Sequence, residues 1–299
     1  MSKNAREDVP LPWNNGEMDR LKLLKYEGLG NDFLVLIDPS RAVDFDANLA
    51  KAVCDRHLGV GADGLLRLSL PLHGGDLFME LRNADGSIAE TSGNGLRCAV
   101  LAGYHEKIID QLQVDVETTV GTSRVEILAM DRIGGGEIRV EMGQAVITRD
   151  ETSDTKTRIA YRVDIGNPHL VLLATDDDEM DIRVIGPALE SAVPGGQNIE
   201  LVTLTNDRSL INVDTWERGA GLTLACGTGS CAAAAAAHLS GYVDASVKVH
   251  NPGGDVTIEL SGAPTAPELI LTGAARRIFS IALETDDLDS MNLAIGRDA

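Results

Sequence analysis

The 299-residue sequence contains few aromatic residues and few basic residues relative to acidic ones. Aromatic residues make up only 3% of the chain and hydrophobic residues 43%, so a core must be built mainly from aliphatic side chains. Lysine and arginine total 26 against 46 aspartates and glutamates, which gives a formal net charge of −20. Because phosphate-rich partners require clustered basic side chains, this composition argues against nucleic acid or an anionic membrane as the partner.

Cysteine and long apolar runs are also scarce. The four cysteines, at positions 54, 98, 226 and 231, are too few and too unevenly spaced for a disulfide scaffold. They form no Cys-x-x-Cys pair and have no histidine cluster nearby, so their spacing predicts no metal site. No apolar run approaches the roughly 18 residues that cross a bilayer, and the N-terminus lacks the apolar stretch of a signal peptide. We therefore expect a cytoplasmic protein.

Short β-branched segments separated by glycine turns indicate many strands. They lie at 33–37, 114–117, 124–128, 138–142, 162–165, 169–173, 199–202, 211–215, 247–249 and 256–260. Two helices are predicted, at about 93–104 and 227–238. The second contains six consecutive alanines, and alanine is the best helix former. The segment at 54–57 fits the end of a further helix.

Two motifs occur twice in the same order. Residues 30–33 (GNDF) are matched by 166–169 (GNPH), and residues 92–95 (SGNG) by 226–229 (CGTG), at offsets of 136 and 134 residues. The offset is an ordinary domain length. We therefore predict an α+β fold of two pseudo-symmetric domains, each a mostly antiparallel sheet or barrel around one central helix, with the active site between them. The predicted halves are 22–145, completed by a strand near 276–284, and 146–275, with tails at 1–21 and 285–299.

Each copy of the second motif places a potential acid–base residue, Ser92 or Cys226, just before a glycine-rich helix start. The first N–H groups of a helix lack intrahelical partners, and the helix dipole adds positive potential, so a carboxylate can bind there. The same field is expected to lower the pKa of the Cys226 thiol toward neutrality. The simpler alternative is two ordinary N-capped helices, since serine is a favoured N-cap.

Two such helix starts, if they face one another, hold a proton acceptor and a proton donor on opposite sides of a bound α-carbon. One group then removes the α-proton while the other delivers a proton from behind, which inverts a stereocentre without a cofactor. The spacing of these motifs alone indicates only that the ligand is a small amino acid with a carboxylate.

As a set, the motifs resemble the diaminopimelate epimerase family. They are residues 25–33 (KYEGLGNDF), 54–56 (CDR), 59–64 (GVGADG), 82–87 (RNADGS), 93–98 (GNGLRC), 166–169 (GNPH), 217–219 (ERG) and 225–229 (ACGTG). The similarity extends from about Leu23 to Leu271 in the family's order. It implies an isomerase that interconverts LL- and meso-diaminopimelate on the route to lysine and cell-wall peptide, without pyridoxal phosphate or metal.

The resemblance also implies roles for single residues. Cys226 matches one of the family's two catalytic cysteines, and His169 and Glu217 are expected to tune the acid–base pair. The residues implied to contact the substrate are Asn31, Asn83, Asn167, Asn198, Glu217 and Arg218, with the N–H groups of Gly93, Asn94, Gly227 and Thr228 holding the reacting carboxylate. The small-molecule substrate is the implied partner, and a homodimer is the default expectation for such an enzyme.

Ser92 departs from the family, which has cysteine at this position. A hydroxyl is a weaker acid than a thiol and needs an adjacent base to react. Cys98 is not expected to replace it, because six residues along a helix is nearly two turns. Three interpretations stay open: an epimerase with slow or lopsided activity, a changed reaction in which only Cys226 acts, as in dehydratases of the related proline-racemase-like group, and a catalytically silent amino-acid binder.

Overall fold

The computed structural model describes residues 20–89, 92–150, 159–174 and 180–284. The predicted tails lie outside these residues, except that Arg20 and Leu21 begin the first strand. The predicted N-terminal tail is therefore two residues too long. No helix among the described residues is long and apolar enough to cross a membrane.

The first half of the chain alternates strand pairs with helices. Its elements are β1(Arg20–Gly28), β2(Asn31–Ile37), α1(Ala47–Cys54), β3(Gly64–Ser69), β4(Leu77–Asn83), α2(Gly93–His105), β5(Gln113–Thr118), β6(Gly121–Met130) and β7(Gly135–Gln144). The second half contains β8(Val146–Arg149), β9(Ile159–Asp164), β10(Pro168–Ala174), α3(Ile182–Glu190), β11(Asn198–Leu204), β12(Leu210–Glu217), β13(Gly221–Thr223), α4(Gly227–Leu239), β14(Ser246–Asn251) and β15(Gly254–Ala263). The long strand β16(Ala266–Glu284) follows.

The two halves repeat one topology, which confirms the predicted pseudo-symmetry. In the first half β1 and β2 are antiparallel, β2 and β3 parallel, β3 and β4 antiparallel, and β4 and β5 parallel. In the second half β9, β10, β11, β12 and β14 follow the same sequence of pairings. A parallel pair needs a crossover connection, and the helices supply it. α2 and α4 therefore occupy equivalent positions.

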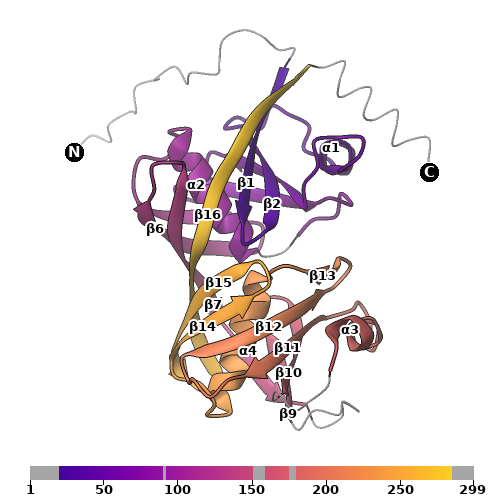
Figure 1. Cartoon of the computed structure of the whole chain (residues 1–299). Coiled ribbons are helices and arrows are strands. Elements are labelled where there is room, and N and C mark those ends of the chain that lie inside the picture. Colours follow the sequence, from indigo (N-terminus) through magenta and orange to yellow (C-terminus); the bar gives the residue numbers. More distant parts are fainter. Residues whose placement is uncertain (1–19, 90–91, 151–158, 175–179, 285–299) are drawn as a thin grey trace.

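Strand β16 belongs to both halves, and Figure 1 shows it as one long ribbon that passes from one half to the other. Its C-terminal part pairs with β1, from Glu27↔Arg276 to Arg20↔Glu284, and this pairing closes the first half into a barrel. Its N-terminal part pairs with β7 and β15. In the second half, Ile147 of β8 donates a backbone hydrogen bond to Thr265 beside β16, at 3.0 Å.

A buried helix lies at the centre of each half. Residues 93–103 of α2 and 227–237 of α4 are all buried. The six alanines of α4 are at most 1% exposed, so their small side chains let the sheet pack close to the helix backbone. The N-terminal ends of these two helices lie where the halves meet, and they position the site.

Candidate active site

The N-terminal residues of the two central helices have the same geometry. Ser92 and Cys226 are both extended N-cap residues, with φ of −143° and −115°. Ser92 Oγ accepts a hydrogen bond from the Gly95 amide at 2.9 Å, and Cys226 Sγ accepts one from the Gly229 amide at 3.4 Å. The two copies of the motif therefore form equivalent helix N-caps, in which the acceptor is the oxygen of Ser92 in one copy and the sulfur of Cys226 in the other.

These two helix starts face one another at close range. A Cβ atom built on Gly227 would lie 3.3 Å from the Cα atom of Gly93 and 3.5 Å from the Asn94 amide nitrogen. Backbone can approach backbone this closely because neither glycine carries a side chain. The structure thus brings together the two predicted N–H pairs, Gly93 with Asn94 and Gly227 with Thr228.

Asn94 is a buried residue that links the two halves. Its Nδ2 donates to Asn31 Oδ1 at 3.1 Å and to the carbonyl oxygen of Ala225 at 3.2 Å, next to Cys226. Its Oδ1 accepts a hydrogen bond from Arg97 at 2.7 Å. The amide of Asn31 in turn donates to Asp63 at 2.9 Å. Both asparagine side chains are therefore held by protein groups, and their roles toward a substrate stay predictions.

The Cys226 thiol is buried, and its electrostatic surroundings differ from those expected at a helix start. Burial raises the pKa of this thiol well above its usual value, and the nearby carboxyl groups of Glu217 and Glu200 raise it further. Hydrogen bonds with Thr228 and the Gly229 amide act in the opposite direction but are outweighed. The expectation that the helix terminus lowers this pKa is therefore wrong, because desolvation disfavours the thiolate more than the helix start favours it.

Glu217, at the end of β12, stands beside Cys226. The residue is partly exposed, but its carboxyl group is buried, and burial raises the pKa of that carboxyl. Hydrogen bonding to Cys226 acts in the opposite direction. Both groups thus hold their protons more tightly than they do in water.

His169, Asn167 and Thr228 form a chain of contacts that ends at Cys226. His169 Nε2 lies 3.0 Å from Asn167 Oδ1, and Asn167 Nδ2 donates to Thr228 Oγ1 at 3.4 Å. Thr228 Oγ1 lies 3.4 Å from Cys226 Sγ. The predicted tuning residue His169 therefore reaches the thiol through two intermediate side chains.

The remaining predicted residues lie around this centre. Asn198 accepts a hydrogen bond from the Arg218 backbone amide at 2.9 Å and donates to the Pro168 carbonyl at 3.3 Å. Arg218 is exposed. Asn83 is also exposed, and its amide bonds Ser87 at 3.0 Å rather than another predicted site residue. These contacts show how the side chains are held in the protein.

Two buried residues of the site were not predicted from the sequence. Arg97 is fully buried, donates to Asn94 and to the Ala274 carbonyl, and has its pKa lowered to about 10 by burial. Glu200 is also fully buried and contacts His169. The sequence does contain a signal for Glu200, because it is the one carboxylate in the otherwise apolar strand segment 199–202. A charged side chain is rarely buried without a partner, so a carboxylate in such a segment indicates a paired, buried group.

The other cysteines are not alternatives to Ser92. Cys54, Cys98 and Cys231 are at most 1% exposed, and burial raises the pKa of each to about 12. All three are therefore buried core residues rather than acid–base groups of the site.

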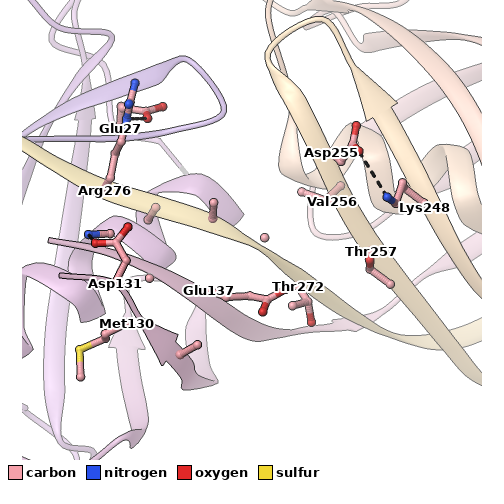
Figure 2. Close-up of a pocket in the computed structure, with 16 residues that line it drawn as sticks. Glu27, Met130, Asp131, Glu137, Lys248, Asp255, Val256, Thr257, Thr272 and Arg276 are labelled. Carbon is pink, nitrogen blue, oxygen red and sulfur yellow. Dashed lines mark hydrogen bonds and ion pairs between the residues drawn. The ribbon is translucent and has the colours of Figure 1, made fainter. Parts of the chain in front are cut away.

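A separate cavity of about 550 Å³ lies over β16 and the neighbouring strands (Figure 2). Arg276 pairs with Glu27 on one side, and Lys248 pairs with Asp255 at 3.5 Å on the other. None of the predicted site residues lines it. The paired helix starts, rather than this cavity, are the candidate active site.

Solved structures with the same fold place the chain in a class of two-domain proteins. A probable proline racemase from Agrobacterium radiobacter superposes with a TM-score of 0.72 at 16% identity, over 91% of this chain and 95% of that one. A PhzF-family phenazine biosynthesis protein from Bacillus anthracis superposes with a TM-score of 0.70 at 14% identity, over 89% and 99%. At these identities the likeness shows the fold alone.

Sequence relatives specify the family within that class. The family model for diaminopimelate epimerase matches residues 23–148 and 161–278. A diaminopimelate epimerase from Desulfitobacterium hafniense is 35% identical over 291 residues, covering 90% of this chain and 100% of the relative. One from Desulforudis audaxviator is 37% identical over 278 residues, covering 87% and 98%. The chain belongs to the diaminopimelate epimerase family and is an isomerase.

Proposed function

We propose that the protein interconverts LL- and meso-diaminopimelate by proton transfer at the α-carbon, without an organic cofactor or a metal, in lysine and cell-wall precursor synthesis in the cytoplasm. The observation that carries the proposal is the pair of facing helix starts, capped by Ser92 and Cys226, with Gly227 against Gly93. Family membership supports diaminopimelate as the substrate.

The helix starts would bind the reacting carboxylate. Gly95 and Gly229 donate their amides to the two cap side chains. The preceding amides, of Gly93 with Asn94 and Gly227 with Thr228, have no acceptor within their helices. Two positive helix ends pointing at one carboxylate stabilise the negative charge that develops when the α-proton leaves.

Cys226 would transfer the proton on one face of the substrate. Its thiol lies close enough to the Glu217 carboxyl group for the two to interact electrostatically, and burial raises the pKa of both groups. A basic carboxylate beside the thiol accepts its proton, and the thiolate then removes the α-proton. In the reverse direction, the thiol delivers a proton to the α-carbon.

Ser92 would be the slower partner on the other face. Its hydroxyl is half-buried and holds the same cap position as Cys226. Binding of the substrate is therefore expected to survive the replacement of sulfur by oxygen. Proton transfer is expected to suffer, because an alkoxide is much harder to form than a thiolate.

The experiment is deuterium exchange at the α-carbon in D₂O, started separately from LL- and meso-diaminopimelate. We expect Cys226→Ala to abolish exchange on both isomers and Ser92→Cys to raise interconversion by about 10²–10⁴-fold. Cys231→Ala, a buried cysteine of the same helix, is the matched control and is expected to exchange like the parent. Activity is expected to persist with a chelator and without pyridoxal phosphate absorbance.

Each alternative has its own result. Exchange retained in Cys226→Ala contradicts the acid–base assignment. One-sided exchange in the parent, with interconversion restored by Ser92→Cys, indicates an epimerase scaffold diverted at one position. If neither protein exchanges deuterium, diaminopimelate is the wrong substrate, and binding or elimination with other amino acids takes its place. A homodimer stays a prediction, to be checked by light scattering.

A further inference from the structure

Glu200 is a buried carboxylate directly beneath the start of α4. Its Oε1 lies 2.8 Å from His169 Nδ1, and neither side chain is exposed. A Cβ atom built on Gly229 would come within 2.6 Å of the same oxygen. Glu200 Oε2 has no hydrogen-bond partner among the residues that the structure describes. A carboxylate buried so deeply is costly, so its contact with His169 calls for an explanation.

From Glu200 a continuous chain of polar contacts leads to the thiol of Cys226. It passes through His169, Asn167 and Thr228, at distances of 2.8, 3.0, 3.4 and 3.4 Å. The residues come from β11, from β10 and the turn before it, and from α4. Residues far apart in the sequence thus form one connected path.

The chemistry of the donors gives this chain a direction. A carboxylate only accepts hydrogen bonds, so His169 Nδ1 must carry a hydrogen. His169 Nε2 faces Asn167 Oδ1, also an acceptor, so this nitrogen carries a hydrogen too. Asn167 Nδ2 then donates to Thr228 Oγ1, which leaves the Thr228 hydroxyl hydrogen to donate to Cys226 Sγ. The Nδ1 hydrogen points to Glu200, and from Nε2 onward each hydrogen points toward the sulfur.

Such a chain favours the thiolate, because a sulfur anion accepts the Thr228 hydroxyl more strongly than a thiol does. We propose that Glu200 is a positioning residue: by accepting a hydrogen bond from His169 Nδ1 while Nε2 faces Asn167 Oδ1, it orients the whole hydrogen-bond network so that Thr228 donates to Cys226. The proposal rests on the proposed function only in taking Cys226 as the acid–base group.

Charge and orientation predict opposite effects for the variant Glu200→Gln. The titratable groups around the thiol are Glu217 of β12, Glu200 of β11 and His169 of β10. Through its charge alone, Glu200 raises the pKa of Cys226, so removing the charge makes the thiolate easier to form. In the orientation model, Gln is a weaker acceptor that no longer requires a hydrogen on both ring nitrogens, so Nε2 can accept from Asn167 and the direction of the hydrogen bonds reverses. Thr228 no longer donates to the sulfur, and the thiolate becomes harder to form.

The test measures the thiolate directly, without substrate. Alkylation of Cys226 by iodoacetamide is followed against pH by mass spectrometry, with fragmentation to separate it from Cys231. For Glu200→Gln we expect alkylation at pH 7.5 to slow by about three- to tenfold, the loss of one hydrogen bond to the anion. The midpoint of the pH profile is expected to rise by about half to one unit.

The matched variants locate the effect in the chain. Thr228→Val is expected to slow alkylation to the same degree, Thr228→Ser to leave it unchanged, and the double variant Glu200→Gln/Thr228→Val to add nothing further. Ser230→Ala, which removes a buried hydroxyl of the same helix that bonds Asn251 instead, is expected to match the parent. If Glu200→Gln does not fold, Asn167→Ala breaks the same chain closer to the sulfur and is expected to give the same slowing.

Faster or unchanged alkylation in folded Glu200→Gln overturns the proposal, and so does a slowing that persists on the Thr228→Val background. The result is independent of the substrate assignment. If alkylation slows in the variants as expected but the parent exchanges no deuterium, diaminopimelate is rejected as the substrate and the hydrogen-bond network is supported. If deuterium exchange occurs but alkylation does not slow in the variants, the role of the network is rejected and the epimerase assignment stands.

Discussion

At the scale of single residues, Ser92 and Cys226 show how one atom changes chemistry while geometry is kept. Oxygen at one helix start and sulfur at the other accept equivalent hydrogen bonds from the third residue of their helices. We therefore expect the consequences of the serine to be confined to proton transfer. The Ser92 hydroxyl is a weak acid, and the single hydrogen bond that it accepts from the Gly95 amide does not make it as acidic as a thiol.

Asp32 is a residue whose ionisation stabilises the first half. It lies 2.5 Å from Lys25 Nζ and 2.7 Å from Arg56 Nη2. Burial opposes ionisation, but hydrogen bonds from Arg56 and Lys25 outweigh it and lower the pKa of Asp32 to about 2. A carboxyl with a lowered folded-state pKa stabilises the protein above its unfolded-state pKa, near 4, and loses that contribution as pH falls through 2.

We therefore predict that Asp32→Asn lowers the free energy of unfolding by about 2 kcal/mol at pH 7. The difference between parent and variant is expected to narrow as pH falls from about 4 toward 2. Urea unfolding at pH 7, 4 and 3 measures both quantities. Asp244→Asn, which breaks an exposed pair with Arg208, is the control and is expected to cost less than about 1 kcal/mol at any pH. A pH-independent loss in Asp32→Asn would contradict the linkage.

At the scale of elements, the central helices are equal in length and position but differ in composition. Both contain 13 residues. α4 contains six consecutive alanines, and alanine is the best helix former, whereas α2 carries Gly103 near its C-terminal end. Glycine inside a helix is destabilising because it loses more backbone freedom on folding than alanine.

Gly103→Ala is predicted to stabilise the protein by about 0.5–1 kcal/mol. A Cβ atom there would meet Ile109 at 3.5 Å, an ordinary van der Waals contact. Thermal or urea unfolding gives the measurement. Gly59→Ala is the opposite case, because its Cβ atom would lie 2.1 Å from the Ala52 carbonyl oxygen, and we expect clear destabilisation. If the two substitutions changed the free energy of unfolding equally, the space available for the added Cβ atom would not explain their effects.

At the scale of the whole molecule, the site exists only where the two halves meet. Strand β16 runs through both halves (Figure 1). Asn94 of the first half donates a hydrogen bond to the Ala225 carbonyl of the second. The separation of the helix starts is set by Gly227 against Gly93.

Gly227→Ala is predicted to reduce epimerisation by about 10- to 100-fold with little loss of stability. Its Cβ atom would lie 3.3 Å from the Gly93 backbone, which cannot rotate away, so the halves must separate by a few tenths of an ångström. A small displacement of acid–base groups costs orders of magnitude in rate. Steady-state kinetics of Gly227→Ala measures the loss of activity, and Gly103→Ala, which lies away from the helix starts, is the control. Full activity in Gly227→Ala would show that this close approach is unnecessary.

Much of the fold could be predicted from local pattern. All ten predicted strands and both predicted helices overlap observed elements. The strand β3 was missed because all six of its residues are buried, so it lacks the alternation that marks a half-exposed strand. The helix α3 was missed because Gly186 and Pro187 lie within it. Only the C-terminal part of β16 was predicted, since its length follows from pairing with β1, β7 and β15.

By itself the sequence determined the repeat, the two cap residues and the family, because these depend on residue identity and order along the chain. Only the tertiary structure decided the electrostatics of Cys226 and the place of Glu200 in the site. Both depend on which side chains from β10, β11 and β12 come to surround the start of α4 and exclude water from it. Desolvation and neighbouring charge are properties of that packed arrangement, so they outweighed the effect expected of the helix start alone.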